Sequence, residues 1–309
     1  MSDPVEFFEK PEAGEVYMLI GWRQWADAGS MSSGLPQYLV ELTGARKIGR
    51  VRPDDFYLFQ FPGTHDLIRP VVKYEEGYPV SLETPNNEIF FTEVGRCGLV
   101  IFIGDEPHLG VEAYAGSILS AARTLGVRRI VGFGGVYGEL PYDRERLVSC
   151  VYSLPQMKEE IESLAVNLSD YHGGASIGSY VCKRAGEEGV EFVSFYAFVP
   201  TYEFSGLNQA GSSIRIENDH KAWFDVLRRV VHMLHLELDL SDLEKKSEGL
   251  TQLLDAKVQE LDQSSPQLGV RDYMNRLSER FNEMAFDPLE QVWEDELRRL
   301  SNKFDLEEE

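Results

Sequence analysis

The sequence has few cysteines, few basic residues and no long apolar run. Its 309 residues include 3 cysteines, 30 lysines and arginines, and 52 aspartates and glutamates, which gives a net charge of −22. No apolar segment approaches the roughly 20 residues that a membrane-spanning helix needs. We therefore expect no membrane span, no binding to anionic membranes and no disulfide framework. The negative charge also disfavours nucleic acid as a partner, because such binding needs a basic face.

The common sequence signatures of cofactor, metal and nucleophile chemistry are missing as well. The chain has no GxxxxGK[ST] phosphate loop, no GxSxG motif and no CxxC pair,. His232 and His235 have metal-ligand spacing on an expected helix, but no third histidine or cysteine lies near them in the sequence,. We therefore expect no metal site and no cofactor. Residues 1–15 do not resemble a secretory signal, which predicts a cytoplasmic protein.

The centre of the chain, residues 98–135, has the pattern of a strand, a helix and a second strand. Residues 99–103 are an unbroken apolar run, residues 111–125 place apolar side chains at helical spacing, and residues 130–133 are mostly apolar again,. A glycine follows each of these three segments, as is usual where a strand or helix ends. This order predicts a right-handed βαβ unit and therefore an α/β domain with parallel strands.

The remaining elements are expected on both sides of this unit. We expect further strands at residues 15–21, 56–61, 67–74, 88–92, 146–152 and 190–199, and helices at 32–42, from Pro155, before Gly189 and from Asn218. The aromatic segments 56–61 and 67–74 predict a small antiparallel section or an excursion from the main sheet. From Ser241 onward the pattern is helical, with helices expected near 241–263, 273–284 and 289–300.

This change of pattern predicts two parts, an α/β domain over residues 1–240 and a helical C-terminal extension over residues 241–309. The amphipathic helices of the extension have two interpretations. They can pack on their own domain as a lid, or they can pair with another subunit.

Polar and aromatic residues follow several of the predicted strands. Ligands of open α/β sheets bind outside the carboxyl ends of the strands, so these loops are the expected place for a site. The candidates for a catalytic role, as acids, an arginine and a phenol that could converge there, are Asp27, Glu106, Arg144 and Tyr202,. The candidates for contact with a ligand are Trp22, Asp105, His108, Tyr137, Gly173 and Gly174, the two glycines preceding a helix whose N-terminus could hold a phosphate,.

Each of these candidates also has a structural interpretation. The charged residues can pair with one another and seal the loops, since structural ion pairs also gather at strand ends. His108 can act as a base or a ligand, or it can cap the helix that follows it. Glycines such as Gly173 commonly turn a corner of the chain without binding anything.

Several of the quoted stretches, in their order along the chain, resemble the proteasome assembly chaperone family of the second-subunit type, in its bacterial and archaeal branch. The resemblance covers most of residues 21–243. It rests on Gly21-Trp22 with Asp27-Ala28-Gly29, Phe56-Tyr57, Arg69-Pro70, Gly104-Asp105-Glu106-Pro107, Leu125-Gly126-Val127, Tyr171 with Gly173-Gly174-Ala175-Ser176-Ile177-Gly178, and Leu236–Leu243.

The resemblance implies a three-layer α/β sandwich like that of nucleoside phosphorylases, with a mostly parallel central sheet. It also implies a homo-oligomer whose protein partners are proteasome-like subunits. The sequence departs from the family pattern in three places. Tyr142-Asp143 and Thr201 stand where the family often has histidine motifs, and the final residues Leu306-Glu307-Glu308-Glu309 differ from the hydrophobic-tyrosine tail that docks some archaeal members on the proteasome.

Two functions from different classes follow. The first is a non-enzymatic oligomeric binding or assembly protein, which is favoured because no motif supplies a nucleophile, a metal set or a cofactor cradle. The alternative is an enzyme on a phosphorylase-like scaffold, which would use the four catalytic candidates on a small substrate bearing a phosphate or carboxylate group. An enzyme needs an enclosed pocket where the loops meet, whereas an assembly protein needs an exposed apolar surface.

Overall fold

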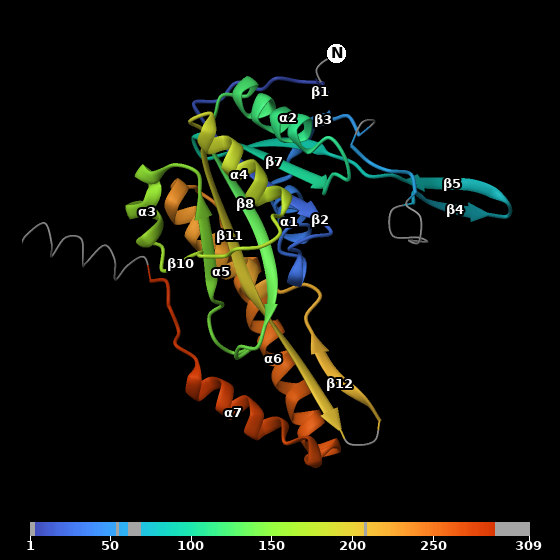
Figure 1. Ribbon diagram of the computed structural model, residues 1–309, viewed down its shortest axis with the longest axis vertical. Coiled ribbons are helices and arrows are strands. Elements are labelled where there is room, and N and C mark those ends of the chain that lie inside the picture. The colour runs from blue at the N-terminus through green and yellow to red at the C-terminus, as the bar shows by residue number, and fades with distance from the viewer. Residues whose placement is uncertain (1–3, 54–55, 61–68, 207–208, 288–309) are drawn as a thin grey trace, which may run out of the picture.

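The computed structural model describes residues 4–53, 56–60, 69–206 and 209–287, and a ten-stranded mixed sheet forms its centre (Figure 1). The four central strands are parallel and lie in the order β7 (Cys97–Asp105), β2 (Glu15–Arg23), β8 (Val127–Gly138) and β11 (Glu191–Gly206). Helix α2 (Val111–Thr124) connects β7 to β8, so the predicted βαβ unit is confirmed. Its two strands are not direct neighbours, however, because β2 lies between them.

Shorter strands extend the sheet on both sides of this parallel centre. On the β7 side they are the antiparallel strands β6 (Glu88–Val94), β3 (Arg46–Val51) and β1 (Val5–Phe7). Beyond β11 lie the antiparallel strand β9 (Val148–Tyr152) and the two-residue strand β10 (Asn167–Leu168). Strand β12 (Gln209–Arg215) pairs with the far end of β11, which runs beyond its neighbours. The sheet thus has an antiparallel border on each side of a parallel core.

Helices cover both faces of the sheet and form a three-layer α/β sandwich. Helices α2 and α4 (Ile177–Glu187) pack on one face. Helices α1 (Gly34–Thr43), α5 (His220–Leu234) and α6 (Ser241–Ser264) pack on the other (Figure 1). Alternate residues of β2 enter the two cores, with Met18 and Ile20 on the α2 side and Tyr17 and Leu19 on the α5 side. Because side chains of a strand alternate, a strand buried on both faces needs the continuous apolar sequence found here.

The C-terminal extension packs on its own chain. Helix α6 lies against α5, and α7 (Val270–Arg280) lies against α6. The extension buries six apolar side chains in the same core as the α5 face of the sheet, namely Leu243, Leu254, Val258, Val270, Met274 and Phe286. Of the two interpretations, the residues of the extension up to 287 thus follow the one in which it packs on its own domain. The helix expected at 289–300 lies outside the described residues. The division of the chain at residue 240 stays a prediction.

Among the differences between the expected elements and the structure, two concern the loop before α2 and the cap of α5. The expected strand at 56–61 is wrong for residues 56–60, which form a turn and irregular chain. Phe56 is buried, and its carbonyl oxygen accepts hydrogen bonds from the backbone N–H groups of His108 and Leu109, so it anchors the loop before α2 instead of pairing in a sheet. The cap of α5 is Asp219 rather than Asn218, and its carboxylate accepts a hydrogen bond from the Ala222 N–H at 3.0 Å.

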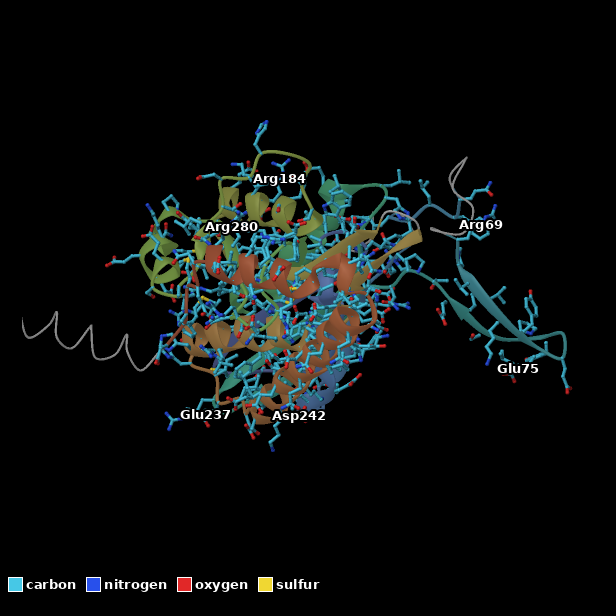
Figure 2. The ribbon with its side chains drawn as sticks, turned by 90° about the horizontal axis from the view of Figure 1, so that it is seen from below. Arg69, Glu75, Arg184, Glu237, Asp242 and Arg280 are labelled. Atoms are coloured by element: carbon cyan, nitrogen blue, oxygen red, sulfur yellow. The ribbon has the colours of Figure 1, made fainter. Side chains whose placement is uncertain are left out.

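Strands β4 (Val71–Glu75) and β5 (Tyr78–Glu83) form a separate two-stranded hairpin, which we call the arm (residues 71–83). Figures 1 and 2 both show the arm standing away from the body of the molecule, with Glu75 near its tip. Every residue of both strands is exposed. The expected excursion from the main sheet is therefore present, although residues 67 and 68 of its predicted first strand lie outside the described residues.

A buried ion pair ties the loop before β9 to the start of α5. The Arg146 guanidinium donates to both Asp219 carboxylate oxygens, at 2.9 and 3.2 Å, and neither side chain has any exposed area. The same guanidinium donates to the carbonyl oxygens of Tyr142 and Arg144. Next to this pair lies the buried carboxyl group of Asp225, which accepts a hydrogen bond from the Arg146 backbone N–H at 2.8 Å.

Asp225 makes folding sensitive to pH. Burial raises the pKa of its carboxyl group to about 6, above the ordinary value of about 3.9 that it has in the unfolded chain. At a pH between about 4 and 6, the Asp225 carboxyl group is therefore protonated more often in the folded protein than in the unfolded chain. Above pH 6 the carboxylate is ionised in both states, and its burial lowers the stability of the folded state. We expect Asp225→Asn to stabilise the protein by about 3 kcal/mol at pH 8 and by about half as much at pH 5.

Urea unfolding at the two pH values measures this difference. Asp219→Asn is the matched control, because it weakens a buried ion pair and should destabilise the protein at both pH values. An Asp225→Asn effect of the same size at pH 5 and pH 8 would contradict the prediction.

Candidate functional site

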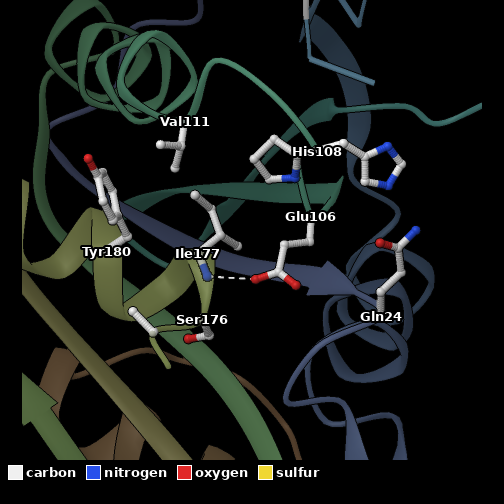
Figure 3. A pocket seen from close by; sticks show the side chains of 9 residues that line it. Gln24, Glu106, His108, Val111, Ser176, Ile177 and Tyr180 are labelled. Carbon is white, nitrogen blue, oxygen red and sulfur yellow. Dashed lines mark hydrogen bonds between the residues drawn. The ribbon is translucent and has the colours of Figure 1, made fainter. Parts of the chain in front are cut away.

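Two adjoining cavities lie at the carboxyl ends of β2 and β7, and together we call them the strand-end cleft. The smaller has a volume of about 210 Å³ and is lined by Gln24, Glu106, Pro107, His108, Val111, Ala175, Ser176, Ile177 and Tyr180 (Figure 3). The larger has a volume of about 540 Å³ and is lined by Arg23, Gln24, Arg69, Leu82, Glu83, Thr84, Pro85, Asn86, Asp105 and His108. Gln24 and His108 line both cavities. The cleft is therefore where topology predicts a ligand site.

Glu106 occupies the N-terminus of α4. Its carboxylate accepts a hydrogen bond from the Ile177 backbone N–H at 2.8 Å, shown as the dashed line in Figure 3. The Ser176 side chain caps the same helix by accepting from the Ser179 N–H. Burial raises the pKa of the Glu106 carboxyl group, and the hydrogen bond from Ile177 opposes that rise. A negative charge is favourable at a helix N-terminus, so Glu106 takes the position that a bound anion would take.

This arrangement bears on the predicted phosphate cradle at Gly173 and Gly174. The two glycines precede α4 as expected, but the helix N-terminus behind them already carries the Glu106 carboxylate. The carbonyl oxygen of Gly174 accepts a hydrogen bond from the hydroxyl group of Tyr171. The two glycines therefore shape a loop beside the cleft, and a ligand-binding role for them stays a prediction.

Asp105 is held by groups of its own chain. Its carboxylate accepts from the Arg23 guanidinium at 3.3 Å and from the Asn86 backbone N–H at 2.8 Å. The Arg23 guanidinium also donates to the side-chain oxygen of Asn86. Asp105 thus joins β7 to the segment that leads from the arm to β6, and it forms part of the wall of the larger cavity.

A buried polar network supports this wall from behind. The Trp22 indole N–H donates to the Tyr114 hydroxyl at 3.0 Å, and the Tyr114 and Tyr57 hydroxyls both donate to the Asn87 side-chain oxygen at 2.8 Å. Burial raises the pKa of both tyrosines, which therefore stay protonated donors. Trp22, a predicted ligand contact, is buried in this network and does not line either cavity.

His108 presents one ring nitrogen to the cleft. Its Nδ1 atom accepts a hydrogen bond from the Leu58 backbone N–H at 3.1 Å, and its ring packs edge-to-face on Tyr57. A neutral ring with Nδ1 as acceptor carries its proton on Nε2. His108 can therefore donate a hydrogen bond from Nε2 in the cleft, on the side where Gln24 lies in Figure 3.

Asp27 closes the loop after β2 instead of lining the cleft. One carboxylate oxygen accepts from the backbone N–H groups of Ser32 and Ser33 at 2.8 and 2.9 Å, and the other accepts from the Ser33 hydroxyl at 2.7 Å. The loop lies directly on β8, where a side chain at Gly135 would come within 2.1 Å of the Ala28 carbonyl oxygen. Burial raises the pKa of Asp27, and these hydrogen bonds oppose the rise.

Arg144 and Tyr202 lie with the C-terminal extension, so the expected convergence of the four catalytic candidates is wrong. The Arg144 guanidinium pairs with Glu283 at 3.5 Å. Tyr202 is buried, donates to the Leu140 carbonyl oxygen at 2.5 Å and packs edge-on against Tyr273. The physical reason is strand length, because Tyr202 follows the last β8 partner of β11 and pairs with β12 instead.

Tyr137 also lies away from the cleft. It is on β8 opposite Val199 of β11. Its hydroxyl accepts a hydrogen bond from Arg215 at 2.9 Å, and the Arg215 guanidinium lies over its ring at 4.5 Å from the centroid. The ring and the guanidinium thus hold β12 against β8, and a ligand-binding role for Tyr137 stays a prediction.

Asn86 and Asn87, which shape the cleft, and the buried Arg146 and Arg229 were not among the residues predicted from the sequence. For Arg229 a signal exists, because it falls on the apolar face of α5 at helical spacing from Val226 and Met233, which are buried with it. A charged residue on such a face predicts a buried partner, which here is Glu145 at 2.7 Å,.

No group of three or more histidine, cysteine, aspartate or glutamate side chains among the described residues could hold a metal ion. The rings of His232 and His235 lie 6.4 Å apart, and the three cysteines are free thiols, two of them buried. In the described part of the chain no helix is long and apolar enough to cross a membrane. The absence of a cofactor stays a prediction.

The protein is thus an α/β sandwich whose mixed sheet has a cleft at the strand ends and an arm beside that cleft. The chain belongs to the PAC2 family, whose model matches residues 22–258. This confirms the resemblance to proteasome assembly chaperones stated from the motifs. No curated protein matches the chain significantly.

Solved structures share this fold at low sequence identity. A PAC2 family protein from Streptomyces avermitilis is 22% identical, with a TM-score of 0.67 over 84% of this chain and 99% of that one. A proteasome-assembly chaperone homologue from Mycobacterium tuberculosis is also 22% identical, with a TM-score of 0.66 over 78% of this chain and 94% of that one. A protein of unknown function from Corynebacterium glutamicum is 17% identical, with a TM-score of 0.71 over 96% and 98%. At these identities the likeness shows the fold alone.

Proposed function

We propose that this protein is a non-enzymatic assembly protein that acts as a homo-oligomer in the cytoplasm and binds subunits of a proteasome-like particle. The observation that carries the proposal is the arm, whose strands expose apolar side chains along their whole length. Exposed apolar surface of this kind marks protein–protein contact. A relative of the same fold described as a proteasome-assembly chaperone homologue supports the choice of partner.

The internal bonding of the strand-end residues supports the same function. Asp27, Asp105 and Glu106 each accept hydrogen bonds from groups of their own chain. A site for chemistry would need acids, bases or nucleophiles that are free to reach a substrate. These carboxylates instead fix the loops and the start of α4, which suits a rigid surface better than a reaction centre.

The proposal predicts an oligomer that binds unassembled subunits. We expect native mass spectrometry of the purified protein to show a defined homo-oligomer. Mixed with separately purified proteasome-type subunits from the same organism, the protein should form a complex of fixed stoichiometry that disappears once those subunits have assembled. A monomer that binds no such subunit would contradict the proposal.

One observation favours the alternative of an enzyme. Glu106, whose carboxyl pKa is raised by burial, lines the same small cavity as His108 and could act as an acid on a ligand bound there,. The same experiment separates the two functions. If Glu106→Gln left the complex intact but abolished turnover of a phosphate- or carboxylate-bearing metabolite, the enzyme would be the better description.

A further inference from the structure

The arm exposes six large apolar side chains to solvent. Its large apolar residues are between 41% and 72% exposed, and they are Val71, Val72, Tyr74, Tyr78, Val80 and Leu82. Val72 lies directly opposite Leu82, and Tyr74 is two residues further along the same face,. A single two-stranded hairpin is marginally stable at best, and it gains stability when a face packs on something else. The arm therefore needs a partner surface.

Apart from Leu82 at its base, which lines the larger cavity, the arm does not find that surface on the described residues of its own body. Figures 1 and 2 show it projecting clear of the sheet and of its helices in two perpendicular views. Strands of five and six residues reach roughly 17–20 Å, at about 3.3 Å for each residue. This length is enough to lie across a neighbouring molecule while the base of the arm stays in place.

A second exposed apolar surface borders the strand-end cleft. Trp25 after β2 is 59% exposed, and Leu109 and Val111 after β7 are 49% and 37% exposed. Trp25 is the neighbour of Gln24, Leu109 is the neighbour of His108, and Val111 lines the smaller cavity. We call Trp25, Leu109 and Val111 the cleft rim. Two separate apolar surfaces, the arm and the cleft rim, are thus left exposed by the part of the chain that the structure describes.

We propose that the arm of one copy of this chain packs on the cleft rim of a second copy, so that the cleft of each molecule is completed by its neighbour. This inference rests on the proposed oligomeric function. One such contact covers one face of the arm together with the cleft rim, whereas a symmetric contact between two arms would leave the cleft rim in water,.

The charge at the tip of the arm fits this occupant. Glu75 and Glu76 lie at the tip, and Arg69, for which the described residues provide no ion pair, lines the larger cavity, whereas Arg23 there is already paired with Asp105. Covering the face of the arm that carries Val72, Tyr74 and Leu82 would remove on the order of 300 Å² from water, so the rest of the roughly 800 Å² that each partner of a standard interface contributes must come from the surfaces around the arm and the cleft,. Because different surfaces meet, the contact is heterologous and closes into a ring when the rotation between copies allows it.

The test uses two double variants that change only exposed side chains. Tyr74→Ser with Tyr78→Ser removes the two rings of the arm, and Trp25→Ser with Leu109→Ser removes the main contacts of the cleft rim. Leu253→Ser is the matched control, because Leu253 is 63% exposed on α6, which belongs to neither surface. We expect each double variant to weaken self-association at least tenfold in sedimentation velocity and the control to leave it unchanged.

Mixing the two double variants distinguishes this contact from other modes of assembly. Each variant alone lacks one half of every contact, but a mixture retains one intact arm and one intact cleft rim. We therefore expect native mass spectrometry, with one variant isotope-labelled, to show a one-to-one heterodimer. A symmetric contact between arms would give no heterodimer and would overturn the inference.

The remaining outcomes are also decisive. If either double variant keeps the oligomeric mass of the parent, the contact between arm and cleft rim is overturned, while the proposed oligomeric function stands. If the parent protein itself is a monomer, both the proposed function and this inference are overturned.

Discussion

Arg146→Ala is expected to lower the free energy of unfolding by roughly 3–5 kcal/mol, because it leaves a buried carboxylate without its partner. Arg146 and Asp219 have no exposed area and share two hydrogen bonds. The substitution also removes the donor that holds the carbonyl oxygens of Tyr142 and Arg144. The loop before β9 and the start of α5 would lose their common anchor together.

Urea unfolding of the variants measures this effect. Arg144→Ala is the matched control, since Arg144 is about half exposed and its pair with Glu283 is long, so its effect should stay within about 1 kcal/mol. Asp219→Ala should cost about as much as Arg146→Ala, and the double variant should cost clearly less than the sum of the two. Additive costs would show that the two side chains do not act as a pair.

The parallel core was predictable from the sequence because a strand that is buried on both faces is apolar at nearly every position. Strands β2, β7 and β11 are nearly continuous apolar runs, and α2 and α5 carry apolar residues at helical spacing. Strand β3, which lies between the edge strand β1 and β6, carries three charged residues among six and could not be recognised in this way. The order of the strands could not be predicted either, because the sequence pattern does not indicate that β2 lies between β7 and β8.

The candidate site was predictable only where its parts are neighbours in sequence. Asp105, Glu106 and His108 line the cleft because they follow one strand directly. Arg144 and Tyr202 do not reach it, since β11 runs on to pair with β12 and carries Tyr202 away from the tips of β2 and β7. The level at which a strand ends depends on its length and register, and neither can be derived from the strand's own composition.

The segment after α7, residues 281–287, is where we expect the second large effect of a substitution on stability. The Phe286 side chain is 2% exposed and lies under the guanidinium groups of Arg228 and Arg229, at 5.6 and 5.0 Å from the ring centroid. Its ring also meets that of His232. The Phe286 N–H donates to the Glu145 carboxylate at 3.2 Å, and its carbonyl oxygen accepts from Arg228. One aromatic residue thus holds the end of the described chain to α5.

We expect Phe286→Ala to remove roughly 3–5 kcal/mol of local stability, since it deletes a buried aromatic side chain. The contacts belong to a terminal segment, so the result should be release of residues 281–287 and not unfolding of the sheet. Hydrogen exchange of these residues should accelerate by a factor of about 100 or more, while exchange in β2 and β7 stays unchanged.

The exposed Asn282 gives the matched control on the same segment, and Asn282→Ala should change hydrogen exchange by less than a factor of about 3,. Glu145 remains paired with Arg229 at 2.7 Å after the segment is released, so the adjacent Arg146 anchor should keep its strength. Unchanged protection in Phe286→Ala would mean that the polar contacts of Glu145 and Arg228 with the backbone hold the segment by themselves. Accelerated exchange that spread into β2 would instead mean that the extension and the sheet unfold as one unit.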